Sequence, residues 1–165
     1  MKNINGVIAY DTINLNEFKD HENEVVNIRG YVHKIREMTG FAFVIIRTAR
    51  DLIQCVYAPE FSDYRWDSKI VEEACVKVTG KVVKSTDAKG NDRFELQIHG
   101  VEILSLPAGE MPIVINKKGL DGVNLNTILD YRPASLRNPK ERAIFKIQEG
   151  IARGFKEYLL QNGFT

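Results

Sequence analysis

The stretch GFAFVIIRTARDLIQCVYAP, residues 40–59, decides the fold expected for this chain. Two runs of alternating apolar residues, 41–47 and 52–57, flank the polar turn residues 48–51, a pattern that predicts a β-hairpin. Successive side chains of a strand point to opposite faces. We therefore expect Ala42, Val44, Ile46, Ile53 and Cys55 to point inward, and Phe41, Phe43, Arg47 and Gln54 to point outward. By the same alternation, Glu95 of the last strand is expected on this outer face and Leu96 inside.

An outward-facing aromatic ring beside an outward-facing amide is typical of a surface that binds single-stranded nucleic acid. The ring of Phe43 would stack on an unpaired base, and the amide of Gln54 would read the hydrogen-bonding edge of that base. The alternative is that Phe43 belongs to the core and that Gln54 is a solvated strand residue, because most strand aromatics are buried.

The segments around the hairpin continue the same alternation. We expect strands at 25–35, 75–84 and 93–104, short helices at 15–22 and 66–73, the second with Asp67 near its start, and a polar turn at 87–92. Gly30 and Gly80 lie inside strands, where glycine marks a bend. Three strands, a helix and two strands predict a mainly β protein built on a five-stranded OB barrel. Such barrels bind oligonucleotides on strands 2 and 3, which here are the hairpin.

Beyond the barrel the composition changes. Proline and glycine punctuate residues 107–126, and Asn138 followed by Pro139 is a strong helix start. A helix is expected from Pro139 to about Gln161. Its apolar stripe is Ile144, Ile147, Ile151, Phe155, Tyr158 and Leu159. Because this helix has no obvious partner in the sequence, we expect a piece of a larger protein. The alternative is a helix that packs on the barrel or pairs with a second copy.

The composition excludes several classes of function. A net charge of +1 argues against a general polyanion binder, so any RNA contact must come from a local patch. Cys55 and Cys75 are expected to be reduced, and His21, His33 and His99 lack metal-ligand spacing. No catalytic constellation, signal peptide or membrane span is visible, so we expect no metal site, no membrane association and a cytoplasmic location.

Three segments resemble the N-terminal region of an aspartyl-tRNA synthetase of the archaeal and eukaryotic type, a class II enzyme. They are VNIRGYVHKIREMTGFAFVIIR (26–47), DLIQCVY (51–57) and NLNTILDYRPASLRNPKERAIFKIQEGIARGFKEYLLQNGFT (124–165). The resemblance implies an anticodon-binding domain at 1–106, a hinge at 107–138 and the first helix of a truncated catalytic domain at 139–165. It further implies that the chain alone does not activate an amino acid.

The resemblance also assigns roles to individual residues. Phe43 is similar to the aromatic residue that stacks on an anticodon base, and Gln54 to the glutamine that reads the central uridine. Glu95 is similar to the glutamate that contacts the first anticodon base. Arg36 and, more weakly, Arg29 resemble arginines that engage the anticodon. The interface residues of the helix would be Ile144, Ile147, Ile151 and Phe155, because in this family that helix lies between the two subunits of a homodimer.

The parent enzyme implied by this resemblance joins aspartate to tRNA in two steps, with ATP and Mg as cofactors, whereas this region needs none. Its partners would be the anticodon loop of tRNA and a second subunit. Asparaginyl- and lysyl-tRNA synthetases share the barrel and are alternatives, although the LDYR and LRNP elements favour the aspartyl type. A stand-alone OB module that binds single strands is the alternative from another class.

Overall fold

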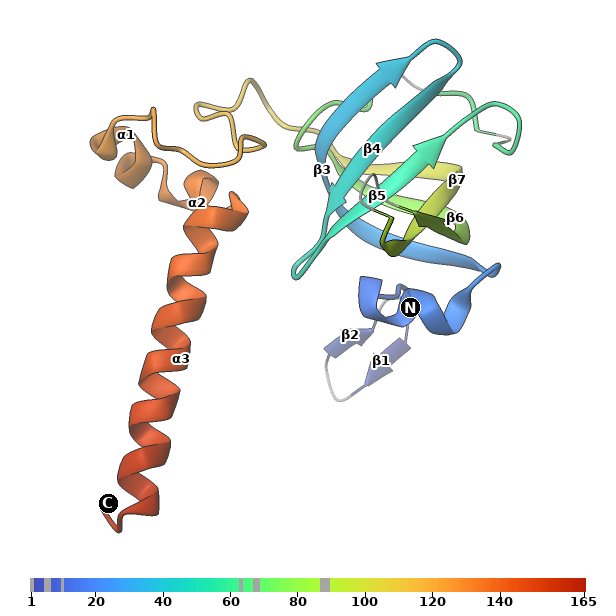
Figure 1. The fold of residues 1–165 in the computed structure, drawn as a ribbon. Helices are drawn as coiled ribbons and strands as arrows, with labels where there is room; N and C mark the ends of the chain where they lie inside the picture. The colour runs from blue at the N-terminus through green and yellow to red at the C-terminus, as the bar shows by residue number, and fades with distance from the viewer. Residues whose placement is uncertain (1, 5–6, 10, 63, 67–68, 87–89) are drawn as a thin grey trace. The chain divides into compact units, whose positions relative to one another are not determined.

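The structure, a computed structural model, describes residues 2–4, 7–9, 11–62, 64–66, 69–86 and 90–165. These residues belong to two compact units, Met1–Ala108 and Gly109–Thr165. In Figure 1 the first unit runs from blue to yellow and contains the sheets, and the second ends in a long red helix.

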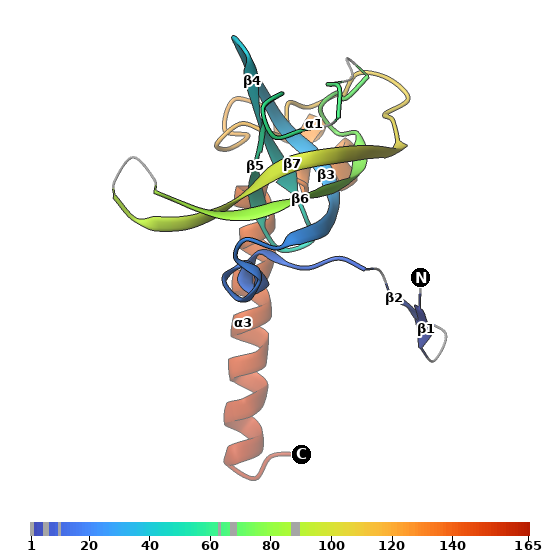
Figure 2. The ribbon, with the colours of Figure 1, turned by 90° about the vertical axis from the view of Figure 1, so that its right-hand side faces the viewer.

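The first unit is built on a closed five-stranded barrel, as expected from the sequence. Its strand order is β3-β4-β5-β7-β6, and every neighbouring pair is antiparallel except β5 and β7. Figure 2 shows β6 and β7 side by side as a long hairpin. The strands are β3 (Val25–Met38), β4 (Phe41–Arg47), β5 (Leu52–Tyr57), β6 (Cys75–Thr86) and β7 (Asp92–Ser105). A separate two-stranded sheet pairs β1 (Lys2–Ile4) with β2 (Val7–Ala9).

Alternating side chains of all five strands fill the barrel. The five residues expected to point inward from the hairpin are buried, and the largest fully buried side chains include Phe18, Ile28, Ile46, Ile53, Leu96 and Ile98. Cys55 lies among them as a free thiol, and its burial raises the pKa of the thiol far above the ordinary value. The expectation of a packed, reduced cysteine at this position is confirmed.

Two glycines allow the barrel to close. A Cβ atom on Gly30 would lie 2.5 Å from the carbonyl oxygen of Arg47, and one on Gly80 would overlap the carbonyl oxygen of Gln97. Both positions therefore exclude any side chain, since real Cβ atoms do not approach backbone oxygens this closely. The glycines mark the bends that the sequence predicted.

The two short helices expected in the first unit have different outcomes. Residues Leu15–His21 form a 3₁₀ helix, η1, and the carboxylate of Glu17 accepts hydrogen bonds from the backbone and side chain of Asn14. The helix expected at 66–73 is absent from the described residues of that segment. Glu73 has a φ of 66°, which no α-helix contains. The predicted Asp67, and residues 87–89 of the predicted polar turn, lie outside the described residues.

Trp66 contacts the strands β5 and β3. The ring of Trp66 lies 5.2 Å from the ring of Tyr57, and its backbone N–H donates to the Tyr57 hydroxyl at 3.2 Å. Its indole N–H donates to the carboxylate of Glu37. These three contacts hold Trp66 against the strands.

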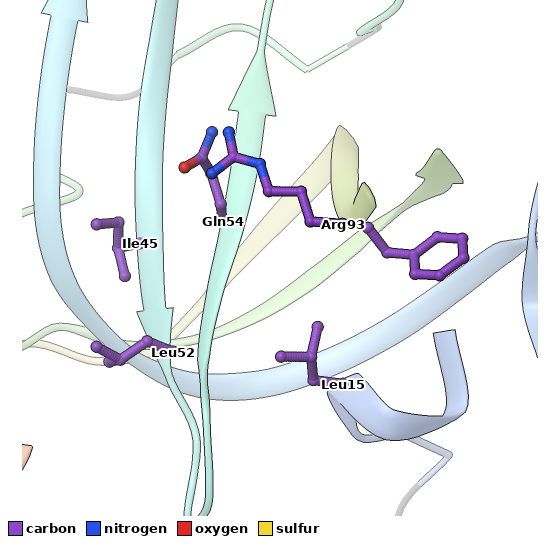
Figure 3. A pocket seen from close by; sticks show the side chains of 6 residues that line it. Leu15, Ile45, Leu52, Gln54 and Arg93 are labelled. Atoms are coloured by element: carbon purple, nitrogen blue, oxygen red, sulfur yellow. The ribbon is translucent and has the colours of Figure 1, made fainter. Parts of the chain in front are cut away.

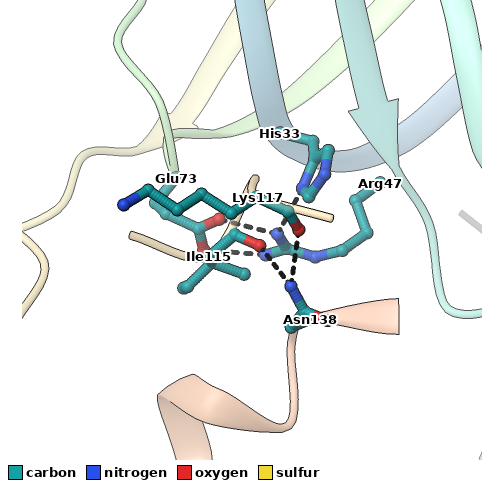
Figure 4. Close-up of polar contacts among 6 residues, drawn as sticks. All are labelled: His33, Arg47, Glu73, Ile115, Lys117 and Asn138. Carbon is teal, nitrogen blue, oxygen red and sulfur yellow. Dashed lines mark hydrogen bonds and ion pairs between the residues drawn. The ribbon is translucent and has the colours of Figure 1, made fainter. Parts of the chain in front are cut away.

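The second unit consists of three helices, α1 (Leu125–Asp130), α2 (Arg132–Ser135) and α3 (Pro139–Gln161). Asn138 fixes the start of α3, as drawn in Figure 4. Its side-chain amide donates to the carbonyl oxygens of Ile115 and Lys117, at 2.9 and 2.8 Å, and its side-chain oxygen accepts from the backbone of Lys140. One buried side chain therefore caps the helix and holds the preceding loop.

The apolar stripe of α3 is open to solvent. Ile147, Ile151 and Phe155 are each about two-thirds exposed, and Ile144 is about half exposed. Water-exposed apolar surface of this extent on one helix face is unfavourable in water.

The sequence predicted that Arg47 lies on the outward face of its strand, and the structure adds that this side chain is covered. It lies on the outer face but is only 6% exposed, and its guanidinium makes two hydrogen bonds of 2.7 Å to the carboxylate of Glu73. It also donates to Nδ1 of His33 at 3.1 Å and lies over the ring of Tyr31. Figure 4 shows the guanidinium between the carboxylate and the imidazole. Alternation predicted the face correctly, but it could not predict that Glu73 covers the face.

Replacing Glu73 with glutamine should destabilise the barrel by about 3–5 kcal/mol, because it leaves the buried Arg47 charge without its counter-ion. Urea denaturation followed by circular dichroism measures this. Asp92→Asn is the matched control, since the ion pair of Asp92 with Lys84 lies at the surface, where water screens it. Equal stability of the two variants would contradict a structural role for the Arg47–Glu73 pair.

The stability of the barrel should also depend on His33. Burial lowers the pKa of His33 below its ordinary value of 6.5, and the positive charge of Arg47 lowers it further. The unfolded chain therefore binds the proton more readily, so the neutral histidine contributes stability above 6.5 that is lost as the pH falls below that value. Between about pH 7.5 and about pH 5.5, the free energy of unfolding should fall more in the wild type than in His33→Gln. Parallel curves for the two proteins would contradict this.

Candidate nucleic-acid interface

An open groove runs over the outer face of β4 and β5. It has a volume of about 300 Å³ and is lined by Arg36, Phe43, Ile45, Gln54 and Arg93. Strand register explains the grouping, because Arg36 pairs with Phe43 across β3 and β4, and Ile45 pairs with Gln54 across β4 and β5. Cross-strand partners share a face of a sheet. The groove therefore combines one aromatic ring, one amide and two guanidinium groups.

The ring of Phe43 is held from one side by a neighbour on the same strand. Phe41 contacts it edge-on, with ring centroids 5.3 Å apart and planes at 90°. Phe43 is only partly buried, so the ring is both oriented and accessible. This fits the outward direction expected from alternation, and it disagrees with the alternative that Phe43 is a core residue.

A polar cluster lies beside the ring. The carboxylate oxygen Oε1 of Glu95 accepts a hydrogen bond from Nε2 of Gln54 at 3.0 Å and pairs with Nη2 of Arg93 at 2.5 Å. Gln54 is half-buried and lines the groove. Its Nε2 donates to Glu95, so the amide oxygen is free of this hydrogen bond. Glu95 is 7% exposed, so the carboxylate that alternation placed at the surface is covered by its two partners.

A second groove, of about 410 Å³, shares three walls with the first. Ile45, Gln54 and Arg93 line both, and Leu15, Leu52 and Phe94 complete the second. Figure 3 shows the heads of Gln54 and Arg93 close together, with Leu15 and Leu52 below them. The second groove is mainly apolar and can accept the face of a base or a ribose, whereas the first offers groups that read an edge.

The structure brings together four of the five binding residues predicted from the sequence. Phe43, Gln54 and Arg36 line the first groove, and Glu95 contacts Gln54. Arg29 lines neither groove. It lies in the part of β3 that pairs with β6, where its backbone is in register with that of Lys77.

Sequence reasoning missed several lining residues. Arg93, Ile45 and Leu52 each lie two positions from a predicted residue on the same strand, so alternation could have found all three. Leu15 comes from η1, and no local pattern signals its approach to the strands.

The described residues include no group of three or more histidine, cysteine, aspartate or glutamate side chains arranged to hold a metal ion. Within the same residues, no helix combines the length and the apolar character needed to cross a membrane.

The comparisons with known proteins agree with this geometry. Residues 26–104, which cover nearly all of the barrel, match the tRNA anticodon family, described as an OB-fold nucleic acid binding domain. This segment is therefore an OB-fold nucleic-acid-binding domain.

The chain is similar in sequence to aspartate–tRNA ligases. It is 32% identical to the aspartate–tRNA(Asp/Asn) ligase of Deinococcus radiodurans over 149 residues, which cover 90% of this chain and 32% of that protein. The ligase of the same name from Archaeoglobus fulgidus is 28% identical over 87% of this chain and 33% of its own length. The chain thus spans about a third of these relatives.

A solved structure shows the same fold. The asparaginyl-tRNA synthetase of Pyrococcus horikoshii, in complex with asparaginyl-adenylate, superposes with a TM-score of 0.77 and 21% identity, covering 94% of this chain and 35% of that one.

Proposed function

We propose that the OB domain binds the anticodon loop of a tRNA through the groove of β4 and β5. The observation that carries the proposal is the grouping of Phe43, Gln54 and Arg36 in one accessible groove of a domain of the tRNA anticodon family. An unpaired base stacks on the Phe43 ring, and the Gln54 amide reads its edge, with Glu95 reading the neighbouring base. Arg36 attracts the phosphate backbone of the RNA. The chain has a net charge of only +1, so this attraction must come from individual cations near the groove.

The whole protein, on this proposal, is an aspartate–tRNA ligase that consumes ATP with Mg, acts in the cytoplasm and forms a homodimer. The proposed organisation is an anticodon-binding domain at 1–106, a hinge at 107–138 and the start of a catalytic domain at 139–165. The relatives from Deinococcus and Archaeoglobus are named for both tRNA(Asp) and tRNA(Asn). Binding should therefore be measured with stem-loops of both tRNAs.

Replacing Phe43 with alanine should weaken binding of an anticodon stem-loop by about 1–3 kcal/mol, the contribution of one base–aromatic stack. Fluorescence anisotropy with a labelled stem-loop measures the affinity, and thermal melting verifies that the barrel remains folded. Phe164→Ala is the control, because it removes an exposed ring near the end of the chain. Unchanged affinity in a folded Phe43→Ala protein would disprove the stacking role.

The exposed stripe on α3 supports the proposed homodimer. Ile144, Ile147, Ile151 and Phe155 recur at intervals of three or four residues and are half to two-thirds exposed. An apolar helix face of this kind is stable in water only with a partner, and a second copy presents an identical face.

Sedimentation of the chain should therefore show concentration-dependent dimers that Ile151→Lys weakens at least about tenfold, because it buries an unpaired charge in the interface. Glu149→Gln changes the net charge equally but lies on the opposite side of the helix, and it should leave association unchanged. A wild-type chain that sediments as a monomer at every concentration would rule out this interface in the isolated chain.

A further inference from the structure

The carboxylate of Glu95 controls how the Gln54 amide is oriented. Its Oε1 atom accepts from Nε2 of Gln54 and also pairs with Arg93. An ionised carboxylate can only accept hydrogen bonds, whereas an amide has one end that donates and one that accepts. The NH₂ end of Gln54 must therefore face Glu95, and its oxygen must face away. The chemistry of the pair fixes this orientation.

A fixed amide presents its oxygen and its remaining N–H in one order to a base in the groove. Uracil carries an N–H donor at N3 between two carbonyl acceptors. Cytosine carries an acceptor at N3 beside an amino donor, so the order of its groups is reversed. An amide that cannot turn over matches one of these edges, while an amide free to rotate by 180° matches either.

Arg93 stabilises the carboxylate that imposes this order. It lies on β7 two residues before Glu95, on the same strand face, and its side chain is 42% exposed while that of Glu95 is 9% exposed. Without a cation, a covered carboxylate would turn toward solvent, because a charge shielded from water needs a partner. Gln54 would then lose the constraint on its orientation.

We propose that Arg93 is a positioning residue that, through Glu95, locks the Gln54 amide so that the groove selects uracil over cytosine. This rests on the proposed function, in which the Gln54 amide reads the edge of a base in the groove, and it takes that base to be the central uracil that the resemblance assigns to Gln54. Arg93 need not touch that base. Its effect is on the ratio of the affinities for two RNAs, whereas the loss of a contact with phosphate lowers both affinities equally.

The test compares two anticodon stem-loops that differ only in uracil or cytosine at the central position, with the dissociation constants of the full chain measured at one salt concentration. The variants are Arg93→Gln, Arg93→Lys, Glu95→Gln and the double variant Arg93→Gln/Glu95→Gln. Lys84→Gln is the matched control, because Lys84 is a cation of the same β6–β7 hairpin that pairs with a carboxylate but lines neither groove. Thermal melting establishes that each variant is folded.

Arg93→Gln should lower the preference for uracil about fivefold or more, since one well-placed base-edge contact discriminates by about that factor. Arg93→Lys should retain most of the preference, and Lys84→Gln all of it. Glu95→Gln should relax the preference as well, and the double variant no further than Glu95→Gln alone, because Arg93 acts through Glu95.

Three results would overturn the inference while leaving the proposed function standing. In the first, Arg93→Gln weakens both stem-loops by the same factor or affects neither. In the second, the effects of the two single variants add in the double variant. In the third, the wild type binds both stem-loops equally well. Failure of the wild type to bind either stem-loop would instead overturn the proposed function itself.

Discussion

The close approach of strands at Gly30 and Gly80 is the constraint on which the barrel depends. At each position a carbonyl oxygen of another strand occupies the space that a side chain would need. The approach lets β3 turn from β6 toward β4, and it lets β6 bend over β7. The groove exists because these bends bring β7 beside β5 and so place Arg93 next to Gln54.

Local alternation predicted the strands and the directions of Phe43 and Gln54, because a strand with one buried face repeats every two residues. The long helix was also predictable, since Asn138 and Pro139 are local signals. The predictions failed where a distant segment decides the environment. Arg47 and Glu95 lie on the predicted outer face but are buried, because Glu73 covers the first and Gln54 and Arg93 cover the second.

The missing helix at 66–73 has the same explanation. Its residues have helical propensity, but Trp66 finds a ring and a hydroxyl on Tyr57, and Glu73 finds the guanidinium of Arg47. Tertiary contacts of this kind override local preference. The role of Leu15 in the second groove could not be predicted either, because nothing in the sequence of η1 says which strands it meets.

The junction between β5 and β7 couples the closure of the barrel to the binding of RNA on the proposed function. Only two residue pairs, Cys55 with Leu96 and Val56 with Gln97, join these strands in register. Gln54 lies one residue before this junction on β5, and Glu95 lies one residue before it on β7. An RNA bound as proposed would therefore contact both strands and hold the β5–β7 junction together. Binding of RNA would then stabilise the paired form of the β5–β7 junction, and pairing of the two strands would in turn favour RNA binding. A core substitution that weakens the pairing of β5 with β7 would therefore lower the affinity for RNA without lying near the RNA. Bound RNA would also protect the backbone amides of β5 and β7 from hydrogen exchange with water.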